Sequence, residues 1–553
     1  MPSVETASAI LESLDALGVT HVLYCPGSRS APFAYALEAG SFGGDARPIL
    51  DERGAGFAAV GLARTGALPA VVVTSGTAVA ELAPAVLEAS HARLPLLLLT
   101  ADRPGELRGV GASQATDQSG FFGTHVRASV DLEPQEASPS LVGHLARAVA
   151  AACGAPSGAP GPVQVNVAFR DPLTPVRPAC DCGDEAGASF VPRPTRVLAA
   201  PAVPVPWEDV VGPAAAGLIV AGEGASPRAR EWSAASGFPL LAEPASGAWS
   251  GGGVTPFEQT LVASSLGSEV DTVVVTGRPT LSRPIQALLA RPDVRVVVVD
   301  PHAPWVDISG NAAVVVADLE PAREPIRAAQ AEWASRVRDA AREAGERIDS
   351  LLASGSGRTM LDLARSVAAS TSGPLVLGAS NPVRAFDLAV PTLEGRAVHS
   401  NRGQAGIDGT IATAVGIALG SGYAGEASAP AGERVTAVMG DLTACHDASS
   451  LALASSVRAN LDIVVADDQG GGIFATLEHG RATSPEAYDR WFGLAQTVDY
   501  EALAAAYGVA FARAETPAQL AQLLETGEAG PRLVHAPVER AAHLYPAVRD
   551  VLS

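Results

Sequence analysis

Two aspartates that each follow an apolar run are the first residues whose spacing suggests chemistry. Asp441 comes after the run 435–439 and a glycine, and Asp468 comes after the run 461–466 and just before three glycines. The intervening segment of alanine, serine and leucine has helical spacing, with Arg458 on its last turn. Because the carboxyl ends of parallel strands reach the same edge of a sheet, we expect the two carboxylates to meet in space.

Such a pair of carboxylates suits a divalent cation that holds a diphosphate. Mg²⁺ prefers oxygen ligands, and backbone N–H groups beside glycine can approach phosphate oxygens closely. Aspartate at the end of a strand also occurs as a helix cap in any α/β sheet. The second aspartate at this spacing favours the cation site over the cap.

The stretch 439–474 resembles the thiamine diphosphate signature, in which Gly-Asp is followed by an asparagine pair behind an apolar strand. The resemblance implies thiamine diphosphate with Mg²⁺ or Mn²⁺, and it implies that Asp441, Asp468 and the backbone carbonyl of Gly470 bind the metal. Here Asp467 and Asp468 replace the two asparagines, so we expect an altered metal affinity. The cofactor-binding positions carried over are Gly440, Leu442, Gly471, Ile473 and Phe474.

Glu52 is a second candidate, at the end of the apolar run before a helix of small residues that we expect to begin at Gly54. A glutamate at a helix N-terminus is favoured by the helix dipole whatever its role. By the resemblance, Glu52 is the catalytic residue that binds the pyrimidine ring of the cofactor and promotes its imino tautomer. Apolar surroundings would raise its pKa and suit it to share a proton. Ile407 matches the apolar wedge that bends the cofactor.

Five further motifs narrow the resemblance: CPGSRSAPF, TSGTAVAELAPAVLEA, LTADRP, SNRGQAGIDG and DDQGGGIF. Together they resemble the 2-succinyl-5-enolpyruvyl-6-hydroxy-3-cyclohexene-1-carboxylate synthase family of menaquinone biosynthesis, over about residues 6–535. PGSRS and NRGxxGIDG are specific to that family, whereas TSGTA is shared more widely. The family decarboxylates 2-oxoglutarate and adds the resulting succinyl carbanion 1,4 to isochorismate. The resemblance therefore implies a transferase with these two small-molecule substrates.

Both substrates carry two carboxylates, and the planar arginine fork matches a carboxylate with two parallel hydrogen bonds. The polar positions carried over as substrate-binding are Ser28, Arg29, Arg103, Gln114, Arg283, Ser380, Arg384 and Arg402. Any one arginine can instead form a surface ion pair, and for Arg283 the two interpretations are nearly balanced. The sequence departs from the family pattern at Ser113, Ala379 and Ser282.

Apolar side chains after the metal loop, namely Ile473, Phe474 and Leu477, are expected to wall the reaction centre. The family lacks a histidine base near the thiazolium ring, so His399 and His446 are interpreted as structural. Cys180 and Cys182 stand alone in a loop-like stretch, and we do not expect them to bind metal.

Length and composition limit the class of protein. A chain of 553 residues, 47% hydrophobic, is too long for one core and fits three domains. The formal net charge of −21 argues against nucleic acid as a partner. Five scattered cysteines, no basic leader before an apolar segment and no apolar run long enough for a membrane span favour a cytoplasmic protein.

Alternation of short apolar runs with helical patterns predicts an α/β protein of three doubly wound parallel-sheet domains with the thiamine diphosphate-binding fold. The expected domains are residues 1–180 for the pyrimidine, 196–352 as a central domain and 356–553 for diphosphate and Mg²⁺, with a proline-rich linker over 172–206. Strands are expected at 21–24, 70–74, 96–100, 163–167, 218–221, 272–276, 294–300, 375–377, 436–439, 462–466 and 533–536, and a long charged helix at about 324–352.

Because the family places its cofactor between two subunits, the resemblance implies a homodimer at minimum and favours a homotetramer. One alternative is a thiamine enzyme of the acetolactate synthase type, which lacks clustered arginines and often has a flavin-binding middle domain. The other is a catalytically silent regulatory protein, which is expected to have lost Glu52 or Asp441. Both residues are present.

Overall fold

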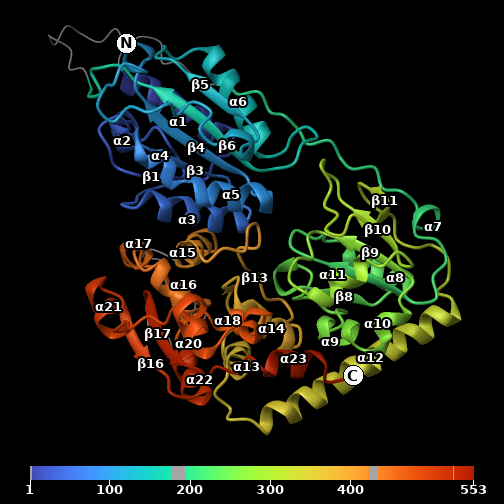
Figure 1. The fold of residues 1–553 in the computed structure, drawn as a ribbon. Coiled ribbons are helices and arrows are strands. Elements are labelled where there is room, and N and C mark those ends of the chain that lie inside the picture. Colours follow the sequence, from blue (N-terminus) through green and yellow to red (C-terminus); the bar gives the residue numbers. More distant parts are fainter. Residues whose placement is uncertain (1–2, 176–192, 423–433, 527–528) are drawn as a thin grey trace. The chain divides into compact units, whose positions relative to one another are not determined.

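The computed structural model describes residues 3–175, 193–422, 434–526 and 529–553 (Figure 1). The chain divides into two compact units, which are described separately below. The first unit comprises residues 1–200 and 412–422, and the second comprises residues 201–411 and 423–553. The first contains one parallel sheet and the second contains two.

The sheet of the first unit has six parallel strands in the order β2-β1-β3-β4-β6-β5. The strands are β1 (His21–Tyr24), β2 (Asp45–Pro48), β3 (Pro69–Val73), β4 (Leu96–Asp102), β5 (Ser129–Leu132) and β6 (Pro162–Ala168). The central strands β3, β4 and β6 are buried along their whole length, which explains their unbroken apolar sequences.

Helices cover both faces of this first sheet (Figure 1). One face packs on α1 (Ser3–Ala16), α2 (Ala31–Glu38) and α6 (Pro139–Ala152), and the other packs on α3 (Glu52–Arg64) and α5 (Ala83–Ala92), with the short α4 (Thr77–Glu81) before α5. Leu97 and Leu99 of β4 belong to the core that includes α1. Side chains alternate along a strand, so the buried Leu96 and Leu98 point to the opposite face of the sheet.

The helix α15 (Thr410–Gly420) packs closely against α3 in the first unit. A Cβ atom at Gly61 would lie 2.1 Å from the carbonyl oxygen of Thr413, and one at Gly416 would lie 1.9 Å from that of Ala58. Glycine at both positions therefore sets the distance between the two helix backbones.

The central sheet, in the second unit, has the order β11-β10-β9-β7-β8 and is also parallel. Its strands are β7 (Gly217–Ala221), β8 (Leu240–Ala242), β9 (Thr272–Thr276), β10 (Arg295–Val299) and β11 (Ala312–Val316). Its helices are α7 (Trp207–Val210), α8 (Ala229–Ser236), α9 (Glu258–Ala263), α10 (Ser265–Glu269), α11 (Arg283–Leu289) and the long α12 (Ala328–Ala353).

The third sheet has the order β13-β12-β14-β15-β17-β16, again parallel. Its strands are β12 (Leu375–Leu377), β13 (Val398–His399), β14 (Val435–Gly440), β15 (Leu461–Asp467), β16 (Ala510–Arg513) and β17 (Arg532–Pro537). Its helices are α13 (Met360–Ser370), α14 (Asn381–Ala389), α16 (Asp441–His446), α17 (Ser450–Ser456), α18 (Gly472–Ala475), α19 (His479–Ala482), α20 (Pro485–Tyr488), α21 (Tyr500–Ala506), α22 (Pro517–Glu525) and α23 (Leu544–Arg549).

The three sheets share one topology. In each, the second strand in the chain lies outside the first, and the third lies on the first strand's other side. The strand order therefore reverses between β1 and β3, between β7 and β9, and between β12 and β14. Ligands of such sheets bind beyond the carboxyl ends of the strands at this reversal. Asp441 follows β14, one of the two strands at the reversal in the third sheet.

The expected fold class is confirmed, and every strand expected from sequence is present with bounds shifted by two residues at most. Several expected boundaries were wrong. The helix between the two aspartates is two pieces, α16 and α17, and Arg458 lies beyond them with φ of 52°. Helix α3 begins at Glu52 rather than Gly54 because the Asp51 side chain caps it, and α12 begins at Ala328.

Each sheet lies within one of the three ranges expected for the domains, whose exact limits stay a prediction. The cysteine pair at 180 and 182 and part of the linker at 172–206 lie outside the described residues. Among the described helices, none is both long and apolar enough to cross a membrane.

The contact between α3 and α15 yields a stability prediction. Gly416→Ala places a methyl group against the Ala58 carbonyl, so we expect it to destabilise the protein by about 1–3 kcal/mol and lower the melting temperature. Gly143→Ala in α6 is the matched control, because its Cβ would meet only the end of Arg147, at 3.5 Å. Equal melting temperatures for the two variants in a thermal scan would contradict this account of the packing.

Candidate active site

The structure brings the two aspartates to neighbouring strand ends. Asp441 begins α16 directly after β14, Asp468 follows β15, and Gly440 pairs with Ala466 in the parallel register. Burial is the main cause that raises the pKa of Asp441 to about 6 and that of Asp468 to about 7, and the charge of Asp441 is the second cause for Asp468. The expectation that the two carboxylates meet is therefore confirmed.

Asp441 has unused capacity for a ligand. It is 2% exposed, and neither carboxylate oxygen has a hydrogen-bond partner of good geometry among the described residues. The N–H groups of Leu442 and Gly470 approach it and lower its pKa, but burial outweighs them. A buried carboxylate without a partner is costly, so a bound cation would relieve it.

The two members of the aspartate pair at 467 and 468 have different environments. Asp467 Oδ2 lies 2.9 Å from His535 Nε2, and Asp467 Oδ1 accepts a hydrogen bond from the Gln469 N–H. The bond with His535 is the first cause that lowers the pKa of Asp467. Asp467 is thus bonded to His535 and to the backbone of Gln469, whereas the carboxylate of Asp468 is the one that interacts with the charge of Asp441.

Glycine is required in the loop that follows Asp468. Gly470 has φ of 128°, and a Cβ atom at Gly472 would lie 1.9 Å from Asp468 Oδ2. The Gly470 carbonyl accepts a hydrogen bond from the Gly472 N–H at 2.9 Å, which leaves its second lone pair for a ligand. No group of three or more metal-ligating side chains occurs in the described part of the chain, so a cation here needs backbone, phosphate or water oxygens as well.

Apolar side chains surround this loop. Ile473, Phe474 and Leu477 are half-buried, and the Phe474 ring lies 5.7 Å from that of Phe492. Leu442 in α16 is also half-buried, as is Ile407 in the segment before α15. His446 lies 3.8 Å from the Asp408 carboxylate and is 41% exposed. The interpretation of the histidines at 399 and 446 as structural stays a prediction.

Glu52 lines an open cleft of about 620 Å³ in the first unit. Its neighbours are polar, among them Thr74, Ser75, Glu81 and Gln114, whereas we expected apolar surroundings. The pKa of Glu52 is nevertheless raised, first by burial and then by the charges of Asp51 and Glu81. The Thr74 hydroxyl is buried in the same cleft and has no partner among the described groups.

Four of the expected substrate-binding residues belong to the first unit. Arg103 donates hydrogen bonds to Ser75 Oγ at 2.5 Å and to the Gln114 carbonyl at 2.6 Å, while the Gln114 amide donates to the Ser75 carbonyl. Arg29 donates to the Phe169 carbonyl at 2.8 Å, and the charge of Arg103 helps to lower its pKa after burial. Ser28 and Ser113 are exposed. Gln114 thus lines the cleft that contains Glu52, and Arg103 adjoins it through its bonds to Ser75 and Gln114.

Three more expected residues cluster in the second unit. Arg384 donates to the carbonyls of Ala379 and Ser380 at 3.1 and 2.7 Å, and Arg402 donates to the Ala379 carbonyl at 3.3 Å. Arg402 is 5% exposed, and its Nε has no partner among the described residues. Burial and the charge of Arg402 lower the pKa of Arg384 to about 10.

Arg283 differs from the other expected arginines because its side chain is exposed. Its side chain is 67% exposed and pairs with the exposed Glu478 at 3.6 Å. This is the surface ion pair that the sequence left as an even alternative. Ser282, which departs from the family pattern, caps α11 by accepting a hydrogen bond from the Ile285 N–H at 3.3 Å.

Two residues near Asp468 escaped the sequence analysis. Asn381 Oδ1 and the Tyr545 hydroxyl are buried without partners among the described residues, and both side chains line a small cavity with Asp468. Asn381 begins α14 beside a proline and looks like an ordinary helix start. Tyr545 lies near the C-terminus in no recognisable motif, so spacing gives no signal for it.

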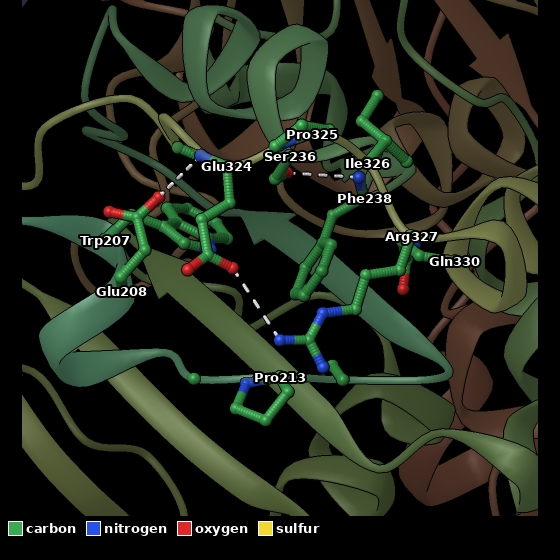
Figure 2. A pocket seen from close by; sticks show the side chains of 13 residues that line it. Trp207, Glu208, Pro213, Ser236, Phe238, Glu324, Pro325, Ile326, Arg327 and Gln330 are labelled. Carbon is green, nitrogen blue, oxygen red and sulfur yellow. Dashed lines mark hydrogen bonds and ion pairs between the residues drawn. The ribbon is translucent and has the colours of Figure 1, made fainter.

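A separate hollow occurs at the central sheet (Figure 2). Phe238 and Trp207 line it, and the Glu324 N–H donates to Glu208 Oε1 at 3.1 Å. Phe238 precedes β8, so the hollow lies at the amino end of that strand, where parallel sheets rarely bind ligands. None of the expected site residues lines it.

Comparisons with known proteins agree with this geometry. Residues 4–121 match the family described as thiamine pyrophosphate enzyme, N-terminal TPP binding domain, and residues 385–536 match the corresponding C-terminal TPP binding domain. Fold and comparison together define a thiamine diphosphate-dependent enzyme.

Relatives identify the family within that class. The 2-succinyl-5-enolpyruvyl-6-hydroxy-3-cyclohexene-1-carboxylate synthase of Kineococcus radiotolerans is 42% identical over 96% of this chain and 95% of its own. The synthases of Nocardioides sp. and Renibacterium salmoninarum are 40% and 39% identical, over 97% and 100% of this chain and 95% and 97% of theirs. The chain belongs to this synthase family.

The raised and lowered pKa values predict opposite effects of two neighbouring substitutions in metal-free protein. Asp468 has a folded-state pKa above its unfolded value, so the folded state binds the extra proton and loses stability as pH rises from about 4 to about 7. Asp468→Asn should therefore raise the melting temperature at pH 7.5, and the gain should vanish towards pH 4.

Asp467→Asn is the matched control for this prediction. The pKa of Asp467 is lowered, so its stabilisation is present above the unfolded pKa and is lost as pH falls. This variant should melt at a lower temperature than the parent at pH 7.5. The same direction of change for both variants, measured in EDTA, would contradict the assigned environments.

Proposed function

We propose that the protein catalyses the thiamine diphosphate-dependent decarboxylation of 2-oxoglutarate and the 1,4-addition of the remaining four-carbon unit to isochorismate. The products are CO₂ and 2-succinyl-5-enolpyruvyl-6-hydroxy-3-cyclohexene-1-carboxylate, in menaquinone biosynthesis. The names of relatives that are up to 42% identical over nearly the whole chain support the substrates. The observation that carries the proposal is the buried, unpartnered Asp441 beside Asp468 at the carboxyl edge of the third sheet.

The residues at that edge fit a metal-bound diphosphate. Asp441, Asp468 and the free lone pair of the Gly470 carbonyl would hold Mg²⁺ or Mn²⁺. The residues that would bind the diphosphate and thiazolium ring are Gly440, Leu442, Gly471, Ile473 and Phe474, with Ile407 as the apolar wedge. Thiamine diphosphate, when bound, supplies a carbon nucleophile and an electron sink.

Glu52 would hold and release a proton at its carboxyl group. Burial is the main cause that raises its pKa, and the raised pKa favours the protonated carboxyl group that a hydrogen bond to a ring nitrogen requires. The open cleft around it has room for a ring.

The arginines would bind and orient the carboxylates of both substrates. Arg29 and Arg103 with Ser28 and Gln114 form one set, and Arg384 and Arg402 with Ser380 form another. The unpartnered Nε of Arg402 is a buried donor that a carboxylate would satisfy. The exposed Arg283 would contribute through long-range attraction of anions in a chain with net charge −21.

The working protein is proposed to be a cytoplasmic homodimer at minimum and a homotetramer in its full form. Family membership supports this assembly, because the family places its cofactor between subunits. The three described free cysteines are consistent with a reducing compartment. Light scattering at working concentration would test the assembly, and a monomer with full activity would contradict it.

Glu52→Gln tests the reaction and its proton carrier together. The parent, with thiamine diphosphate and Mg²⁺, should release CO₂ from 2-oxoglutarate and form product only when isochorismate is added. Glu52→Gln should lower turnover by about 10²–10⁴-fold, while thiamine diphosphate still binds in a calorimeter, because only the proton exchange is lost. Turnover of pyruvate in place of 2-oxoglutarate would favour the acetolactate synthase type, and unchanged turnover by the variant would remove Glu52 from its role.

Metal dependence separates the two adjacent aspartates. Asp468→Asn removes a charged ligand, so we expect the Mg²⁺ and Mn²⁺ concentrations for half-maximal activity to change by about tenfold or more. Asp467→Asn should change them by much less, because Asp467 binds His535 instead. Equal shifts for both variants in activity titrations would refute the assignment of Asp468 as the ligand.

A further inference from the structure

The loop that would supply the Gly470 carbonyl to a cation has a backbone conformation that needs support from its neighbours. Gln469 has φ of 59° and Gly470 has φ of 128°, so two consecutive residues have left-handed backbone angles. For glutamine this conformation is sterically unfavourable, and it persists only where the surrounding structure holds it. The contacts that hold this turn therefore decide where the Gly470 carbonyl points.

Arg540, in the segment after β17, binds the two carbonyl groups that precede the Gly470 carbonyl. Its Nε donates a hydrogen bond to the Asp468 carbonyl at 2.7 Å, and its Nη2 donates one to the Gln469 carbonyl. A planar guanidinium group can fix two consecutive carbonyls in this way because its donors have a rigid fork geometry. The next carbonyl along the chain, that of Gly470, keeps a lone pair for a cation.

The turn is also held from its amino end. Asp467 Oδ1 accepts a hydrogen bond from the Gln469 N–H at 2.9 Å, and Asp467 Oδ2 lies 2.9 Å from His535 Nε2. Both backbone polar groups of Gln469 are therefore bound, the N–H by Asp467 and the carbonyl by Arg540. These two side chains together fix the peptide units on both sides of the left-handed glutamine.

Arg540 has a third contact, with the short helix η4 (Asp489–Gly493). Its Nη1 donates to Asp489 Oδ1 at 3.1 Å, but the two side chains are 38% and 66% exposed, so solvent weakens this ion pair. The same segment reaches the loop by other bonds, because the Tyr488 hydroxyl donates to the Gly471 carbonyl at 2.8 Å and the Gly471 N–H donates to the Gly493 carbonyl at 2.6 Å. The two carbonyl bonds are therefore the contacts through which Arg540 acts on the turn.

We propose that Arg540 is a positioning residue for the metal ion. By binding the two preceding carbonyls, its guanidinium group directs the Gly470 carbonyl towards the same cation as the Asp468 carboxylate. The inference rests on the proposed function of this loop, and the guanidinium group acts through the backbone rather than as a ligand. Without the fork, the turn should relax from its left-handed conformation and bind the metal more weakly.

The test is the metal dependence of coenzyme binding by Arg540→Met and Arg540→Lys in the full-length protein. Methionine removes the charge and the donors, whereas lysine keeps the charge but lacks the fork. The Mg²⁺ concentration for half-maximal binding of thiamine diphosphate in a calorimeter should rise about tenfold or more for Arg540→Met and at least about threefold for Arg540→Lys.

Two further readouts separate positioning from stability. Binding of Mn²⁺ in the presence of thiamine diphosphate, followed by loss of the paramagnetic resonance signal of the free ion, should weaken in the same order. At saturating Mg²⁺, kcat should stay within about twofold of the parent value, because the metal then occupies its site. A purely structural role would lower the melting temperature and leave the half-maximal metal concentration unchanged.

Arg549 provides the matched control. Its side chain is 37% exposed, almost as much as that of Arg540, and it pairs with Asp550 at 2.6 Å. Arg549→Met and Arg549→Lys make the same chemical changes, and both should leave the half-maximal Mg²⁺ concentration within about twofold of the parent value. Asp489→Asn should do the same, because it removes only the exposed ion pair of Arg540.

The outcomes are distinguishable. A parent protein that binds thiamine diphosphate equally well in Mg²⁺ and in EDTA would refute the proposed metal site rather than this inference. With a metal-dependent parent, an unchanged Mg²⁺ requirement in Arg540→Lys would overturn the inference, because the charge rather than the fork would then matter. Equal shifts in the Arg540 and Arg549 variants would also overturn it, and failure of both Arg540 variants to fold would do so in favour of a purely structural role.

Discussion

The structure depends on a buried negative charge that the protein itself does not neutralise. Parallel pairing of β14 with β15 brings the ends of both strands to one edge, and Asp441 and Asp468 follow those ends. Their pKa values rise to about 6 and about 7, chiefly because burial disfavours the charged forms. The surrounding groups do not offset the cost of this buried charge, since both carboxylate oxygens of Asp441 lack a hydrogen-bond partner among the described residues. A cation with a diphosphate would relieve it, and the adjoining glycines leave space for one.

One topology serves three purposes in this chain. The reversal of strand order lies between β12 and β14 in the third sheet, where Asp441 and the Ala379–Ser380 carbonyls gather, and between β1 and β3 in the first, close to Ser75 and Gln114. In the central sheet the same edge supplies Thr280 and Glu243. Thr280 Oγ1 accepts a hydrogen bond from Arg402 at 3.1 Å, and Glu243 accepts one from the Leu281 N–H at 2.6 Å. The central sheet is thus a support for the arginines of its own unit.

The sequence alone predicted the central strands of each sheet and missed the edge strands. The six strands that were not expected, β2, β5, β8, β11, β13 and β16, are the two edge strands of each sheet. Except for the short β8, they are partly exposed, so they carry no continuous apolar run. Spacing and motifs found Asp441, Asp468 and Glu52. Motifs could not find Asn381 or Tyr545, whose surroundings depend on segments distant in the sequence.

The central claim is that the carboxylate pair binds the coenzyme only through a divalent cation. Titration of thiamine diphosphate into the protein in a calorimeter, once with Mg²⁺ and once with EDTA, tests it most directly. The account predicts saturable binding with Mg²⁺ and loss of binding in EDTA, because diphosphate and bare carboxylates repel each other. Equal binding under both conditions, or no binding with Mg²⁺ present, would contradict it.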